Sequence, residues 1–292
     1  MSITGQDGSP PTVHEGGRWD FLYRLNMPRP FWKVLSVYAI WYFAGLILSA
    51  TSWLPAILRK MSVGWGDSVF LVLASILTVI NARRDFSPSS VIGATLWIIL
   101  IAGIAETLGV MTGFPFGRYV YTDQMGWKLL GIIPWIIPAC WLILVFNAYI
   151  ICCVLIIPRH LPLRDGNHLL ILVTAFVVTL VDFNLEPVAV NVKQYWIWLE
   201  RDHVYYGVPR LNFFGWFVIS MILAGVMSQV LDPRRWRWST ACVSWTILGS
   251  IQLFFAVLNW QAGQLIPVVI TLNLMGLLAI GLVFLWDSKS SP

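Results

Sequence analysis

The sequence predicts an all-α protein, a polytopic membrane helical bundle of about eight transmembrane helices. Of its 292 residues, 58% are hydrophobic and only 11% are charged, and the mean hydropathy is +0.74. Soluble domains carry about 25% charged residues, so this composition indicates an integral membrane protein. Tryptophan is abundant, with 17 copies. Many of these residues lie near the ends of apolar stretches, where an amphipathic ring favours the membrane interface.

A membrane-spanning helix needs about 20 apolar residues, and eight stretches of the chain meet or approach that length. The second stretch is shorter than the others. Pro134 and Pro138 lie near the start of the fourth stretch, and they predict a kink or an irregular first turn there. The predicted spans are residues 31–54, 68–80, 91–111, 131–157, 168–190, 213–231, 240–258 and 265–286.

A single integral membrane domain is predicted over residues 31–287, with a tail on each side. Residues 1–30 are rich in Gly, Pro and Ser and predict a partly disordered cytoplasmic tail and approach segment, without a cleaved signal peptide. Residues 288–292 form the C-terminal tail. Eight spans place both tails on one side of the membrane, together with twelve of the 19 basic residues. The positive-inside rule then predicts cytoplasmic termini.

Several function classes are excluded by what the chain lacks. The net charge of +5 requires no nucleic-acid partner, because basic residues scattered in short loops are typical of membrane orientation and anionic lipid. The four cysteines lack CxxC or metal-site spacing. No histidine lies deep in a span and every lysine lies outside the spans, which excludes a histidine-rich di-iron site and a retinal Schiff base. No nucleotide-binding motif occurs. We therefore expect no metal and no cofactor.

Three carboxylates fall inside the predicted spans: Glu106, Asp182 and Glu186. An ionisable group in the hydrocarbon region costs at least ~2.5 kcal/mol on insertion scales, so it is expected to face the bundle interior or a wet cavity. Asp182 and Glu186 are four residues apart and share one face of a regular helix, although Pro187 disfavours helical geometry at Glu186. The alternative is that these acids pair with Arg118, Arg201 or Arg210, or with helix-end donors, for packing alone.

Two long loops follow these acids on the same, non-cytoplasmic side: residues 112–130 and 191–212. If the three acids lie at similar depths in the membrane, their side chains can converge on one site. Carboxylates gathered in a low-dielectric pocket cannot all ionise easily, so at least one would be a proton donor near neutral pH. Nearby aromatic faces can stabilise a carbocation, although any single aromatic residue also suits the interfacial belt. The polar partners in and beside these loops are Thr112, Tyr119, Tyr121, Asn184, Asn191, Tyr205, Tyr206 and Asn212.

The stretch from Glu106 to Tyr121 has the pattern E-x-x-G-x-x-T-G-x-P-F-G-x-Y-x-Y. This pattern resembles that of the membrane carotenoid 1′,2′-hydratase family, which includes γ-carotene and lycopene-type hydratases and bisanhydrobacterioruberin hydratase. The resemblance covers about residues 90–220. It continues at Pro134, Pro138, Trp141, Asp182, Glu186, Pro187, Trp196, Trp198, Tyr206, Gly207, Pro209, Asn212, Gly215 and Trp216.

The resemblance implies an enzyme, a hydro-lyase that adds water across the terminal double bond of an acyclic carotenoid end group. It implies a lipid-soluble carotenoid substrate, membrane lipid, other enzymes of the carotenoid pathway as partners, and a prokaryotic cell membrane. We expect Glu106 to be the proton donor, with Asp182 and Glu186 placing or activating the water. The expected supporting residues are Thr112, Pro115, Phe116, Tyr119, Tyr121, Asn184, Trp196, Tyr206, Asn212 and Trp216.

Two alternatives remain open at the level of the sequence. A polyprenyl transferase of carotenoid or quinone biosynthesis would use Asp182 and Glu186 as a DxxxE motif for Mg²⁺-diphosphate, but no second aspartate-rich motif occurs in another span. A non-enzymatic transporter or carotenoid-binding protein would use the buried acids as a proton relay and a helix broken at Pro134 and Pro138. No inverted repeat supports that second alternative.

Overall fold

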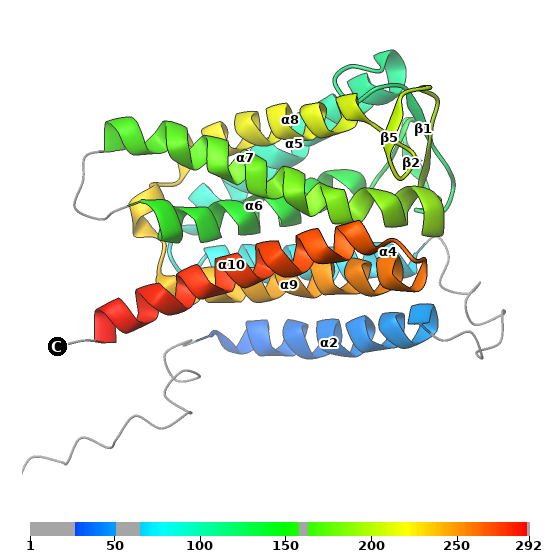
Figure 1. Ribbon diagram of the computed structural model, residues 1–292. Helices are drawn as coiled ribbons and strands as arrows, with labels where there is room; N and C mark the ends of the chain where they lie inside the picture. The colour runs from blue at the N-terminus through cyan, green and yellow to red at the C-terminus, as the bar shows by residue number, and fades with distance from the viewer. Residues whose placement is uncertain (1–26, 51–64, 158–162, 291–292) are drawn as a thin grey trace, which may run out of the picture.

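The computed structural model describes residues 27–50, 65–157 and 163–290. This part of the chain forms a bundle of eight helices with three small two-stranded sheets at one end (Figure 1). Seven of these helices are long and apolar enough to cross a membrane. The predicted fold class, a multi-pass membrane helical bundle, is therefore confirmed.

The helices occur at the eight predicted positions. The shortest predicted stretch corresponds to α4 (Gly66–Ala82), a helix of 17 residues. The other helices are α2 (Arg29–Ala50), α5 (Pro88–Thr112), α6 (Ile137–Ile156), α7 (Leu163–Pro187), α8 (Arg210–Val230), α9 (Trp238–Gln261) and α10 (Leu265–Ser290). The end of the first predicted span, residues 51–54, lies outside the described residues, as do residues 1–26 and 291–292 of the predicted tails.

The predicted start of the fourth span, at residue 131, is wrong. Positive φ angles at Leu130 (50°) and Gly131 (73°) turn the backbone, and β2 (Lys128–Leu129) pairs with β3 (Ile133–Pro134). The helix α6 begins only at Ile137. Pro138 then lies in the first helical turn, where its missing N–H has no intrahelical partner to lose.

The regular helix α7 extends through Glu186, so Asp182 and Glu186 do share one face. It ends at Pro187, and the backbone continues as one π-helical turn, η1 (Val188–Val192). The proline therefore changes the helix type directly after the second acid instead of breaking the helix before it. This turn directs the chain into the loop that carries β4 (Trp196–Trp198), β5 (His203–Tyr205) and β6 (Val208–Pro209).

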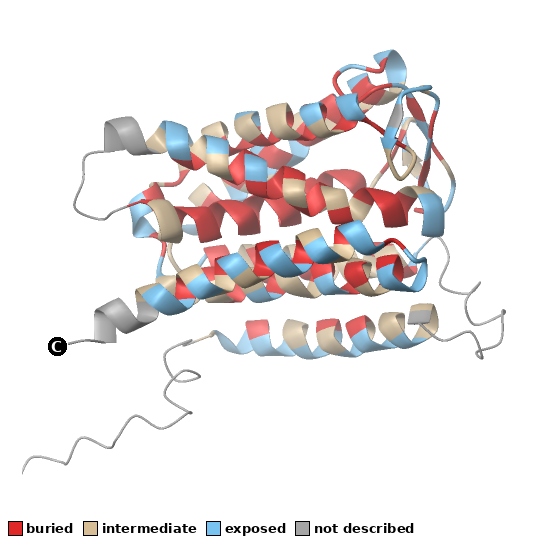
Figure 2. Cartoon of the chain, in the orientation of Figure 1, coloured by how far each residue is buried: buried red, intermediate tan, exposed pale blue. Residues whose placement is uncertain are grey.

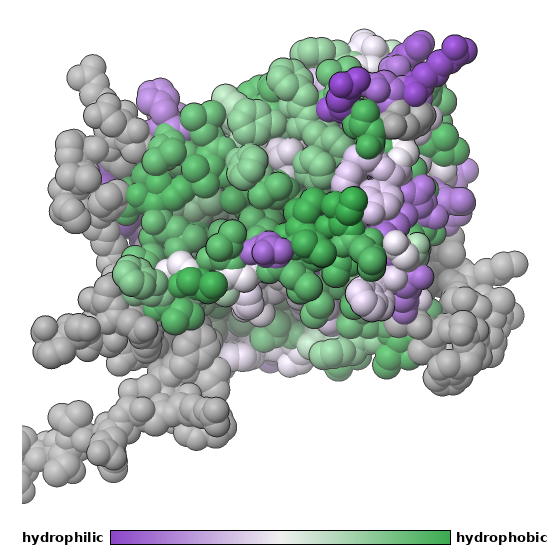
Figure 3. All heavy atoms as spheres, viewed as in Figure 1, coloured by the Kyte–Doolittle hydropathy of each residue, from purple (hydrophilic) through white to green (hydrophobic). Residues whose placement is uncertain are grey.

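The helix α6 is the centre of the bundle. It packs against α4, α5, α7 and α9, and nearly every residue between Ile137 and Cys153 is buried (Figure 2). The helix α2 lies at the edge, against α4 and α9 (Figure 1). In a space-filling view the helices present a broad apolar face, and hydrophilic residues gather at the end that carries the sheets (Figure 3). Apolar sides with polar ends are what a lipid bilayer requires.

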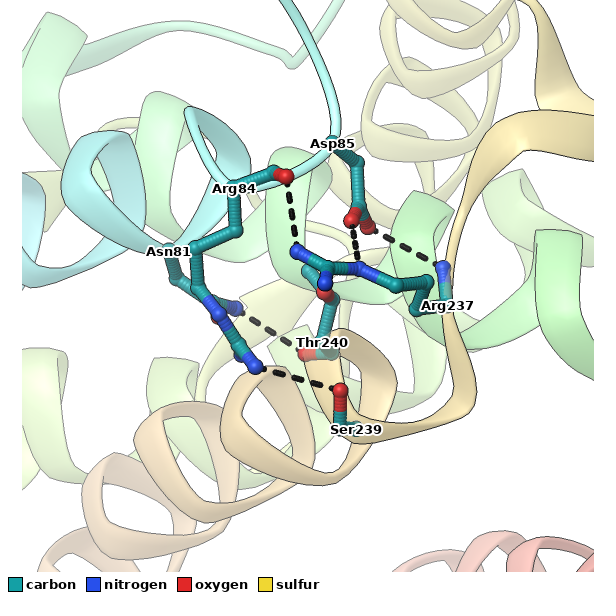
Figure 4. Close-up of polar contacts among 6 residues, drawn as sticks. All are labelled: Asn81, Arg84, Asp85, Arg237, Ser239 and Thr240. Carbon is teal, nitrogen blue, oxygen red and sulfur yellow. Dashed lines mark hydrogen bonds and ion pairs between the residues drawn. The ribbon is translucent and has the colours of Figure 1, made fainter. Parts of the chain in front are cut away.

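A polar cluster at the opposite end ties the turn between α4 and α5 to the start of α9 (Figure 4). The Arg237 guanidinium donates to the carboxylate of Asp85, whose side chain is 1% exposed, and to the Arg84 carbonyl oxygen at 2.7 Å. The Asn81 amide donates to the Thr240 carbonyl oxygen at 2.9 Å. The short helix η2 (Pro233–Arg235) precedes this segment. These contacts fix the end of the bundle that lies away from the sheets.

Candidate active site

A two-stranded antiparallel sheet joins the two long loops above the helix ends. Strand β1 (Tyr119–Tyr121) pairs with β4, with Tyr119 opposite Trp198 and Tyr121 opposite Trp196. Side chains alternate between the two faces of a strand. All four of these aromatic residues consequently point inward and are buried, while the central residue of each strand points outward and is exposed. The strand pairing therefore directs the polar groups of four aromatic side chains toward the helix bundle.

Glu106 lies below this sheet with both carboxylate oxygens hydrogen-bonded. Its Oε2 accepts from the hydroxyls of Tyr119 (2.5 Å) and Tyr121 (2.7 Å), and its Oε1 accepts from the indole Nε1 of Trp141 (2.7 Å). The side chain is only 5% exposed. Burial and the adjacent Glu106 carboxylate raise the pKa of Tyr119 and of Tyr121. Both phenols therefore keep their protons at neutral pH and act as donors to Glu106.

The second pair of acids is bridged by one amide. The Nδ2 of Asn212 on α8 donates to Asp182 Oδ2 and to Glu186 Oε1, each at 3.0 Å. The Oε2 of Glu186 also accepts from the indoles of Trp196 (3.2 Å) and Trp198 (3.3 Å). Asp182 and Glu186 are 0% and 1% exposed, and Asp182 Oδ1 has no hydrogen-bond partner among the described residues. A single sheet thus supplies donors to both Glu106 and Glu186.

No basic side chain within the described ranges forms an ion pair with these three acids. The loop arginines Arg118 and Arg210 pair instead with Glu200 and Asp202. The hypothesis that the acids serve as packing ion pairs with these arginines is therefore not supported. Among the described residues, the hydrogen-bond donors to these acids are neutral groups of Tyr, Trp and Asn. A buried acid without a nearby cation is uncommon unless it has a function.

Glu106 and Glu186 line the same cavity, which has a volume of about 70 Å³. Its walls are mostly apolar and aromatic. The rings of Trp141 and Trp216 stack with centroids 3.9 Å apart, and Phe116 lies 6.1 Å from Trp141. A cavity that holds one water needs about 10–15 Å³, so this one has room for several waters or for a small apolar group. The arrangement can transfer a proton beside aromatic faces.

Two glycines let Phe116 reach this position. A Cβ on Gly109 of α5 would lie 2.8 Å from the Phe116 ring, and a Cβ on Gly215 of α8 would lie 2.6 Å from it. These distances are too short for any side chain larger than hydrogen. The ring therefore inserts between the two helices because both have glycine at the contact.

Some residues predicted for the site lie elsewhere. Asn184 points away from the acids and exchanges hydrogen bonds with Gln252 and Asn259 of α9. Residue 184 follows Asp182 by two positions on a helix, which places it on a different face. Thr112 is exposed and bonds to the Leu108 carbonyl of its own helix. Neither Asn184 nor Thr112 lines the cavity, and Tyr206 and Pro115 do not line it either. Asp182 lies behind Asn212 and also does not line the cavity.

Three polar residues outside the predicted site lie together at the cavity wall: Asp67, Lys193 and Tyr195. Asp67 and Tyr195 line the cavity directly. Asp67 is the second residue of α4 and lies one residue before the predicted second span, so the sequence shows it only as a charge at a helix edge. Two indoles that bond to the acids, those of Trp141 and Trp198, appeared only within the family pattern. The sequence held a signal for Trp198, because the W-x-W repeat at residues 196–198 matches the Y-x-Y repeat at 119–121.

A family model described as "Carotenoid biosynthesis protein" matches residues 66–278, well over half of the chain. The chain belongs to this carotenoid biosynthesis family. The match includes α4 to α9, every strand and all the acids of the cavity, and it begins after α2. Membership confirms the family resemblance that the motifs predict.

A curated relative of this family member is the bisanhydrobacterioruberin hydratase of Haloarcula japonica, with 32% identity over 164 residues. The aligned part is 53% of this chain and 53% of the relative. The chain thus spans about half of the length of the curated relative it matches. No solved structure matches the chain.

Proposed function

We propose that this protein is a carotenoid hydratase, a hydro-lyase that adds water across the terminal 1′,2′ double bond of an acyclic carotenoid end group to give a tertiary alcohol. The observation that carries the proposal is Glu106. It is a buried carboxyl held by three neutral donors in a cavity with aromatic walls. The family and the hydratase relative support the same reaction class.

The first step is protonation of the alkene by the Glu106 carboxylic acid. The acid's O–H bond breaks, a C–H bond forms at the less substituted alkene carbon, and a tertiary carbocation remains. Charge is costly in a low-dielectric interior without a counter-ion, so a carboxyl with only neutral partners is suited to carry that proton. The faces of Trp141, Trp216 and Phe116 stabilise the cation through the ring quadrupole.

The second step is capture of the cation by water. In the proposal, Glu186, which lines the cavity, places or activates this water, and Asp182 acts through Asn212, whose amide donates to both acids and so positions Glu186. The water oxygen forms a C–O bond, and one of its protons passes to a carboxylate. That proton then returns through water in the shared cavity from the second carboxyl to the Glu106 carboxylate, so both acids regain their starting states and each cycle consumes one water and no net proton.

The remaining features follow from an apolar polyene substrate. A carotenoid dissolves in membrane lipid, so the enzyme acts within the bilayer of a prokaryotic cell membrane, with both termini in the cytoplasm. Other enzymes of the carotenoid pathway are its expected partners. The reaction as proposed requires no metal and no cofactor. Among the described residues, no group of three or more His, Cys, Asp or Glu side chains is placed to hold a metal ion.

The test is expression of the chain in cells that accumulate lycopene or γ-carotene, with product masses read for the addition of water. Glu106→Gln keeps the size of the side chain and removes the transferable proton, so it should abolish the product while the protein still folds. Full activity in that variant would refute the donor assignment. No hydrated product from any acyclic end group would refute the function.

Chelation separates this proposal from the transferase alternative. Membranes treated with a chelator should keep hydratase activity, because acid–base hydration uses only protein side chains. A polyprenyl transferase that holds Mg²⁺-diphosphate at Asp182 and Glu186 would lose its activity under the same treatment.

A further inference from the structure

A partly exposed polar cluster lies at the wall of the cavity: Asp67, Lys193 and Tyr195, here named the entrance cluster. The Tyr195 hydroxyl donates to Asp67 Oδ2 at 2.6 Å, and the Lys193 ammonium lies 3.3 Å from both carboxylate oxygens. Burial raises the pKa of Tyr195, and the nearby Asp67 carboxylate adds to that effect. The phenol therefore remains a donor at neutral pH and holds Asp67 in one orientation.

The backbone fixes this cluster to the loops that carry the sheet. The Lys193 N–H donates to the Val188 carbonyl at the start of η1, and the Tyr195 N–H donates to the Ala189 carbonyl, both at 2.8 Å. The Tyr195 carbonyl accepts from the N–H of Thr122 in the other loop at 2.9 Å. Asp67 lies in the first turn of α4, where the helix dipole favours an anion. The cluster is thus a built feature of the bundle end that carries the sheets.

The entrance cluster is more exposed to solvent than the three buried carboxyl groups. Glu106, Asp182 and Glu186 are 5% exposed or less. The side chains of Asp67 and Lys193 are 34% and 23% exposed. Among the described residues that line the cavity, Asp67 is the only charged one that also reaches the surface.

A hydratase needs a route for water, because each turnover consumes one molecule of it. The acids cannot collect water directly, since they are buried beneath the sheet and surrounded by apolar and aromatic side chains. A partly exposed ion pair stays hydrated, and a hydrated group at a cavity mouth supplies partners for the next water inside. Asp67 and Glu186 both line the cavity, whose volume of about 70 Å³ has room for several waters.

We propose that the entrance cluster admits water into the cavity, with Asp67 as the residue that binds the entering molecule. The inference rests on the proposed function, because it supplies the second substrate of that reaction. The carotenoid end group enters the same cavity from the lipid-facing side. Water and polyene thus reach the reacting carbon by separate routes, which keeps the apolar part of the site dry.

The kinetic test is Asp67→Asn, which keeps the shape and removes the charge. The turnover number should fall by roughly tenfold while KM for the carotenoid stays within about twofold, because a water-supply defect slows turnover without weakening polyene binding. Lys193→Met should act in the same direction, and Asp67→Glu should restore most of the turnover. Asp123→Asn is the control, since the Asp123–Lys128 ion pair lies in the loop between α5 and α6 and outside the cavity. An unchanged turnover number in Asp67→Asn would overturn this inference and would leave the proposed function intact.

A second test needs no substrate. Hydroxyl-radical footprinting oxidises side chains that contact bound water. Trp141, which lines the cavity, should be oxidised in the wild type and protected in Asp67→Leu, whereas Trp236, buried outside the cavity, should be protected in both. Equal protection of Trp141 and Trp236 in the wild type would mean a dry cavity and would overturn the inference. A wild type that hydrates no carotenoid would instead refute the proposed function.

Discussion

Replacing Asn212 with leucine tests whether one amide organises the second pair of acids. The change keeps the volume of the side chain and removes two hydrogen bonds between α8 and α7, each of 3.0 Å, to Asp182 and Glu186. Hydrogen bonds between membrane helices contribute on average about 0.6 kcal/mol and at most about 1.7 kcal/mol each. Two bonds to buried carboxyl groups are therefore expected to contribute about 1–3 kcal/mol to the free energy of unfolding.

The assay is SDS-induced unfolding in mixed micelles, followed by tryptophan fluorescence. Asn273→Leu is the control, because Asn273 is exposed on α10 and donates only to the Val269 carbonyl of its own helix. That variant should change the free energy of unfolding by less than about 0.5 kcal/mol. Equal unfolding curves for Asn212→Leu and Asn273→Leu would refute the bridging role.

A double-mutant cycle shows whether the amide acts through the acid. In a Glu186→Gln background, Asn212→Leu should cost less than it does in the wild type, because one of its two partners is already altered. Identical costs in both backgrounds would show that the contact with Glu186 contributes nothing. Hydratase turnover measured on the same variants should fall with Asn212→Leu, because Asp182 and Glu186 are then no longer held in their relative positions.

Two further substitutions test the scaffold of the site. Gly215→Ala places a methyl group against Phe116, so it should lower the free energy of unfolding by about 1–3 kcal/mol and reduce turnover, whereas Gly276→Ala, with no neighbour within 4 Å, should do neither. Arg237→Met leaves the buried Asp85 without its ion pair and should cost about 1–3 kcal/mol. Arg234→Met removes an exposed pair and should leave the unfolding curve in the same assay nearly unchanged, because solvent screens such a pair.

Hydropathy along the chain was sufficient to place the helices. A span in lipid must satisfy its backbone hydrogen bonds internally, so a long apolar run has few other structures available to it. The prediction failed at residues 131–136, where a turn with positive φ angles and a short strand pair replace the first turn of the predicted helix. An apolar run is equally compatible with a buried strand of a few residues, and hydropathy does not distinguish the two.

The acids themselves were also recognisable from the sequence. Glu106, Asp182 and Glu186 were selected because charge inside a span is costly, and the family pattern singled out several of the aromatic residues near them. Asp67 escaped selection because a charge at the first turn of a helix is ordinary, and nothing local to residue 67 indicates that Tyr195 and Lys193 pack against it.

A membrane helical bundle with three intramembrane carboxyls and two aromatic loops can be predicted from the amino-acid sequence, because hydropathy and side-chain chemistry are local properties. The contacts of Tyr119 and Tyr121 with Glu106, and of Trp196 and Trp198 with Glu186, are seen only in the folded structure. That outcome depends on the antiparallel register of β1 and β4, whose residues are more than seventy positions apart in the chain. The register is set by packing across the bundle, and a shift of one strand by one residue would turn the two rings of that strand toward solvent.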